Sequence, residues 1–131
     1  MTVNSLAKHS KRAFVALAAT ASLVACLSPT LPLPPPDEPD SIEASTTEGF
    51  WNVRGNCTPG AVVLIENVAT GEVTGTEDRD YDGRYFVSVA AQVCDVAEVY
   101  EILDTTVSAT TLFVFEPVTN GVPEGDSCQV E

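Results

Sequence analysis

The sequence predicts an all-β protein built around a single small β-sandwich. Beyond residue 48, short apolar runs rich in Val, Thr, Tyr and Phe recur about every 10 to 12 residues, as in antiparallel sandwiches, and no helical periodicity accompanies them. In one run Tyr85, Val87 and Val89 occupy every second position, which predicts a strand with one buried face. The six runs are Phe50–Arg54, Ala61–Val68, Glu72–Thr76, Arg84–Ala90, Ala97–Leu103 and Ala109–Glu116.

The first 25 residues have the form of a secretory signal peptide. Three cationic residues, Lys8, Lys11 and Arg12, precede the apolar segment Ala13–Ala25. That segment has about 13 residues, within the roughly 7 to 15 of a signal peptide and short of the about 20 that a membrane-spanning helix needs. We therefore expect residues 1–25 to be removed.

Leu23, Val24, Ala25 and Cys26 stand at the end of this signal. They resemble the lipobox of bacterial lipoproteins at all four positions, which implies that Cys26 becomes the acylated first residue, carrying a diacylglyceryl group and a further chain such as palmitate. Two or more acyl chains give lasting membrane attachment. The resemblance implies a lipoprotein of the bacterial cell envelope, at the outer membrane or the cell surface. The alternative is soluble secretion after cleavage behind Ala19-Thr20-Ala21.

Cleavage before Cys26 leaves a strongly acidic chain. All 19 acidic residues lie beyond Cys26 together with only Arg54, Arg79 and Arg84, so the net charge becomes three minus nineteen, or −16. Nucleic acid is bound mainly through cationic neutralisation of phosphates, so the mature chain is not expected to bind it. Adsorption to anionic lipid is disfavoured for the same reason, and the covalent lipid is the expected contact with the membrane.

The mature chain also lacks lysine, histidine and methionine. Ser-His-Asp and Cys-His catalysis and His-based zinc sites need histidine, while P-loops and Schiff bases need lysine. Chemistry by paired carboxylates remains available, but Asp104-Thr105-Thr106 matches the Asp-Thr-Gly loop of aspartic proteases poorly. We therefore expect no enzymatic activity.

A proline-rich segment separates Cys26 from the predicted strands. Six of the nine prolines lie within Ser28–Asp40, and a polyproline II chain rises about 3.1 Å per residue, giving a stiff spacer of roughly 40 Å. The polar segment Ser41–Glu48 is expected to complete this linker. The predicted organisation is a signal peptide (1–25), a lipidated cysteine with linker (26–48), and a sandwich (49–131) with an irregular C-terminal tail.

The turns between the runs carry a recognisable order of residues. Glycine, proline, asparagine and aspartate supply the backbone conformations that tight turns need. The order resembles that of bacterial Ig-like and carboxypeptidase-regulatory-like domains over about Val53–Val89, which implies an Ig-like or transthyretin-like sandwich serving as a spacer, adhesive or binding module without an active site. The matching segments are Val53-Arg54-Gly55, Thr58–Leu64, Asn67 with Thr70-Gly71, and Asp80–Val87.

Three cysteines remain once Cys26 is acylated, so one disulfide and one spare thiol are expected. If successive strands alternate in direction, Cys57 lies at one end of the sandwich, and Cys94 and the last strand's end lie at the other. This favours a bond between Cys94 and Cys128. The segment Pro117–Ser127 is long enough to bring Cys128 back to Cys57 instead.

Asp78, Asp80 and Asp82, followed by Gly83, match the opening of a calcium-binding loop. The later positions of an EF-hand fail, because Val89 stands where a bidentate acid belongs. A looser calcium site between strands and an acidic solvated turn remain as the two interpretations. No other cofactor is expected.

These observations together predict a membrane-anchored envelope lipoprotein with a structural or protein-binding role, whose partners are envelope or extracellular proteins. The alternative is a calcium-dependent adhesion or carbohydrate-binding module.

Overall fold

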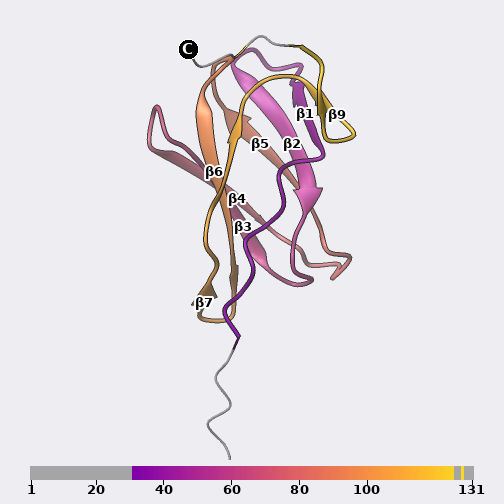
Figure 1. Ribbon diagram of the computed structural model, residues 1–131, viewed down its shortest axis with the longest axis vertical. Helices are drawn as coiled ribbons and strands as arrows, with labels where there is room; N and C mark the ends of the chain where they lie inside the picture. Colours follow the sequence, from indigo (N-terminus) through magenta and orange to yellow (C-terminus); the bar gives the residue numbers. More distant parts are fainter. Residues whose placement is uncertain (1–30, 126–127, 129–131) are drawn as a thin grey trace, which may run out of the picture. The chain divides into compact units, whose positions relative to one another are not determined.

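Ten short strands in two antiparallel sheets make up the folded part of the chain (Figure 1). The computed structural model describes residues 31–125 and residue 128. These residues contain strands and turns but no helix, which confirms the predicted all-β sandwich.

Each sheet has five strands. Sheet A has the order β10-β9-β1-β2-β5, and it consists of β1 (Ser41–Ala44), β2 (Phe50–Asn56), β5 (Arg84–Ala90), β9 (Val118–Thr119) and β10 (Val122–Pro123). Sheet B has the order β4-β3-β6-β7, with β8 also paired to β6. Its strands are β3 (Val62–Asn67), β4 (Glu72–Glu77), β6 (Val96–Leu103), β7 (Thr106–Val107) and β8 (Thr111–Val114).

The six runs predicted from the sequence correspond to β2, β3, β4, β5, β6 and β8, with ends that agree to within two residues. Burial alternates along β2, β3, β5 and β6, as the period of two requires. The inward side chains form one apolar core in which Phe115 packs against Trp51 and Phe113, with ring centroids 6.1 and 5.3 Å apart. Aromatic pairs at such distances add to the free energy gained by burial.

The folded unit begins earlier than the predicted boundary at residue 49. Ser41–Ala44, expected to belong to the linker, forms β1 and pairs with β2 over four residues, and Ile42 is buried at 2% exposure. Part of the expected spacer is also folded onto the sandwich, because Pro36 and Pro39 are buried and the Thr111 hydroxyl donates to the Pro36 carbonyl. β1 was missed because a four-residue strand with one large apolar side chain is too short to reveal a period of two.

The segment after Pro117 is likewise not the irregular tail that the sequence suggested. Val118 pairs with Ile42, and β9 and β10 form a hairpin through Asn120 and Gly121, which both have positive φ. Asn-Gly is the most favourable pair for such a two-residue turn. The dipeptide was therefore a usable signal in the sequence.

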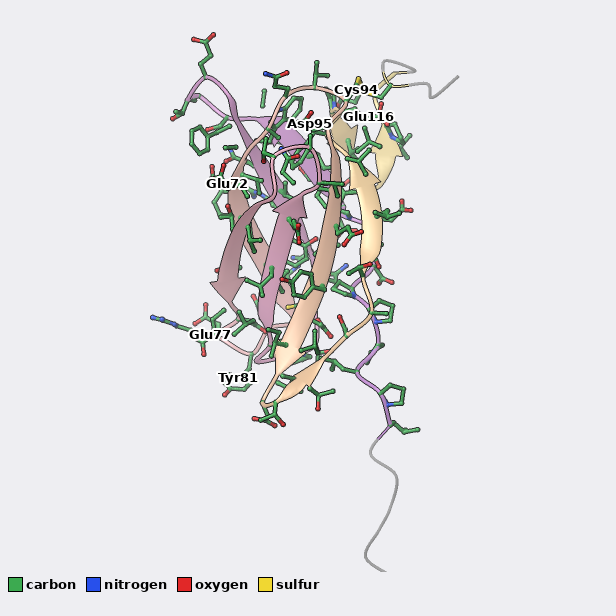
Figure 2. All side chains as sticks on the ribbon, turned by 90° about the vertical axis from the view of Figure 1, so that its left-hand side faces the viewer. Glu72, Glu77, Tyr81, Cys94, Asp95 and Glu116 are labelled. Atoms are coloured by element: carbon green, nitrogen blue, oxygen red, sulfur yellow. A yellow bond between two sulfur atoms is a disulfide. The ribbon has the colours of Figure 1, made fainter. Side chains whose placement is uncertain are left out.

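Because the main strands alternate in direction, the loops gather at two ends. We call the end formed by the loops after β2, β4 and β6 the lower end, where β7 lies in Figure 1, and the end near β9 the upper end. Figure 2 shows Tyr81 and Glu77 at the lower end and Cys94, Asp95 and Glu116 at the upper end.

Candidate functional site

Two buried carboxylates, Asp78 and Glu101, and the thiol of Cys57 lie at the lower end of the sandwich. The turn that follows β2 is held there by Asp78, whose carboxylate accepts backbone hydrogen bonds from Gly60 at 3.1 Å, Gly83 at 2.9 Å and Asp82 at 3.3 Å. Asp78 is 5% exposed. Burial raises the pKa of its carboxyl group, but these amide hydrogen bonds outweigh burial, and the pKa lies below its ordinary value.

Glu101 holds the same turn from the opposite sheet. Its carboxylate is fully buried on the inward face of β6 and accepts hydrogen bonds from the Thr58 amide, at 2.8 Å, and from the Thr58 hydroxyl. The Glu101 amide in turn donates to the Ser108 hydroxyl at 2.9 Å. A buried carboxylate is tolerated when its oxygens are hydrogen-bonded in this way.

Cys57 lies between these two carboxylates as the spare thiol. It packs against the apolar core and belongs to no disulfide in the described part of the chain. Burial, followed by the negative charges of Asp78, Glu101 and Asp82, raises the pKa of Cys57 to about 11. Because the thiolate is the reactive form, this site stabilises an unreactive thiol.

Gly55 and Tyr85 complete the lower end. They are opposite each other on β2 and β5, and the ring lies over the glycine so closely that a Cβ there would be 2.6 Å from the hydroxyl oxygen. The buried hydroxyl has no hydrogen-bond partner within the described residues, and burial raises the pKa of Tyr85. Position 55 therefore requires glycine.

The three aspartates of the calcium-loop motif do not converge on one point in the structure. Asp78 points into the protein, and its carboxylate oxygens accept hydrogen bonds from backbone amides. The Asp82 carboxylate instead accepts a hydrogen bond from the Arg84 amide at 2.9 Å. Within residues 31–125 and at 128, no three Asp, Glu, His or Cys side chains converge so that they could hold a metal ion. Asp80 is exposed, as it would be in an acidic solvated turn.

At the upper end Cys94 is joined to Cys128, with Cα atoms 5.2 Å apart, the pairing that the sequence favoured. Nearby, the buried Asn67 amide donates to Asp95 at 2.9 Å and to the Ala90 carbonyl at 3.2 Å. The upper loops are therefore tied together by a covalent bond and a buried polar network.

The outer surfaces of the two sheets differ in character, a contrast that the strand pattern alone did not reveal. We call the outer side of β2 and β5 face A, and it carries Phe50, Asn52, Arg54, Arg84, Phe86 and Ser88. We call the outer side of β3, β4, β6 and β8 face B, and Figure 2 looks onto it. Its members are mostly aliphatic: Val62, Leu64, Glu66, Val73, Gly75, Glu77, Val96, Glu98, Tyr100, Ile102, Leu112 and Val114.

Cys26 and the rest of the lipobox lie outside the described residues. Among the residues that are described, no helix is long and apolar enough to cross a membrane. Comparisons with protein-family models, curated proteins and solved structures find no match to this chain.

Proposed function

We propose that this chain is a lipid-anchored protein of the bacterial cell envelope whose sandwich has a structural or protein-binding role and no catalytic activity. The observation that carries the proposal is the sequence Leu23-Val24-Ala25-Cys26 behind a cationic and apolar signal. The order of turn residues between Val53 and Val89 supports an Ig-like or carboxypeptidase-regulatory-like module.

The lower end supports a structural role better than a reactive one. Asp78 and Glu101, the buried carboxylates there, accept hydrogen bonds from backbone amides, and the thiol beside them has a raised pKa. The two carboxylates therefore hold the loops of the lower end together. The two outer faces are the surfaces on which we place the binding role, because they carry exposed apolar and charged side chains.

The anchor is tested by replacing Cys26 with alanine. We expect the wild-type protein to sediment with membranes and the Cys26→Ala variant to leave the membrane fraction, because lasting attachment requires the acyl chains. Cys57→Ala is the matched control and should stay with the membranes. Equal distribution of Cys26→Ala and wild type would show that the attachment does not depend on this cysteine.

A further inference from the structure

We propose that the partner of this domain is a second copy of the same chain, with face A of one copy packed on face B of the next. This inference rests on the protein-binding part of the proposed function and is independent of the lipid anchor. It rests on two pairs of like charges that have no partner of opposite charge within the described part of the domain. The pair on face B is acidic, and the pair on face A is basic.

On face B the unbalanced pair is acidic. Glu66 on β3 stands directly opposite Glu98 on β6, and like charges in this position destabilise a sheet. Arg79, in the loop after β4, forms an ion pair with Glu77 at 3.0 Å. Glu66 and Glu98 thus have no cationic partner in the described part of the chain. A cation placed between them would remove the repulsion.

On face A the unbalanced pair is basic. Arg54 is opposite Phe86 and Arg84 is opposite Asn56, so the two arginines are diagonal neighbours on β2 and β5. The Arg54 guanidinium lies 5.0 Å from the centroid of the Phe86 ring, an arrangement that keeps it on the surface. Neither arginine forms an ion pair within residues 31–125, although the chain has 19 acidic residues.

The apolar parts of the two faces also complement each other. Phe50 and Phe86 are 39% and 50% exposed on face A. On face B, a shallow hollow is bordered by Val62, Glu77 and the Leu64 side chain, which lies over Gly75. An aromatic ring from face A would bury apolar surface there, and packed aromatic side chains with arginine commonly dominate protein interfaces.

The placement of the faces determines the kind of assembly. Face A and face B are on opposite sides of the sandwich, so the contact is head-to-tail and can repeat. The arginine pair lies near the lower end of face A and the glutamate pair near the upper end of face B, so the two pairs meet at one level when neighbouring copies point in opposite directions. The net charge of −16 opposes association, so we expect a weak contact.

Charge reversal on each face tests the proposal in the soluble mature chain carrying Cys26→Ser. Sedimentation velocity between about 10 µM and about 1 mM should show a mass that rises with concentration. The variants Arg54→Glu/Arg84→Glu and Glu66→Arg/Glu98→Arg should each weaken association at least about tenfold, or about 1.4 kcal/mol. Mixing them should restore it, because each variant then meets the opposite charge. The control is Asp37→Arg/Glu48→Arg, which changes the net charge as much as Glu66→Arg/Glu98→Arg does but lies outside both faces. This control should not abolish association.

A wild-type chain that stays monomeric throughout this range would overturn the proposal. It would also be overturned if reversal left association unchanged, or if the mixture associated no better than either variant alone. Thermal melting checks that each variant folds, and the single changes Arg84→Glu and Glu98→Arg repeat the comparison if a double variant does not. Because the experiment uses an unacylated chain, its result is independent of where Cys26→Ala fractionates.

Discussion

At the scale of single residues, the acidic side chains at the lower end have two different roles. Asp78 and Glu101 are buried and replace water as acceptors for the amides of the turn after β2. Asp80 lies in the same loop and is exposed. The sequence motif could place three aspartates in one loop, but it could not tell which would turn inward, because that depends on contacts with Gly60 and Gly83 across the fold.

Cys57 gives a pH dependence that follows from this arrangement. Its pKa is about 11, against 9.0 for an ordinary cysteine, so the thiolate is about a hundredfold rarer at pH 8 than in an unfolded chain. Alkylation of Cys57 by iodoacetamide in the Cys26→Ser chain should accelerate about tenfold per pH unit from about pH 7 to about pH 10.

The control is the same reaction in urea with the disulfide intact, where the rate should level off near the ordinary pKa of the thiol. A plateau below about pH 9 in the folded protein would contradict the proposed role of Asp78, Glu101 and burial in raising the pKa. Circular dichroism at each pH establishes that the chain is still folded.

At the scale of elements, the longer strands were predictable and the short ones were not. Val63 and Ile65 in β3 and Val87 and Val89 in β5 repeat often enough to reveal a period of two. β1 offers only Ile42 as a large apolar side chain, and its pairing with β9 joins segments that are distant in the chain. Such long-range pairing leaves no local pattern, whereas the Asn120-Gly121 turn did leave one and could have predicted the last hairpin.

The role of β1 can be measured with one pair of neighbouring substitutions. Ile42→Ala removes a fully buried side chain and should lower the free energy of unfolding by about 2 to 5 kcal/mol. Glu43→Ala, on the exposed side of the same strand, should change it by about 0.5 kcal/mol or less. Urea denaturation of both variants measures the difference. Equal stability of the two would mean that β1 is not part of the core.

At the scale of the whole molecule, the proline-rich segment is not wholly a free spacer. The expected spacer of roughly 40 Å assumed that all of Ser28–Asp40 was free, yet Pro36 and Pro39 are buried against the folded unit. The chain between Cys26 and Pro36 would therefore span about 30 Å when fully extended as polyproline II.

The contrast between the two outer faces was not accessible from the sequence alone, although every residue in it was visible. Glu66 and Glu98 are far apart in the chain, and their opposition depends on the pairing of β3 with β6. The same holds for Arg54 and Arg84, which β2 and β5 bring together. Strand periodicity does not specify the pairing register, and the register determines which side chains share the surface of the proposed binding role.

The intact mass of the protein purified from membranes tests the anchored-lipoprotein account most directly. The account predicts a chain that begins at Cys26, increased by the mass of a diacylglyceryl group and a further acyl chain, and reduced by two hydrogens for the bond between Cys94 and Cys128. An unacylated chain that begins at Ser22 would contradict it, since Cys26 would then be an ordinary cysteine of a secreted protein.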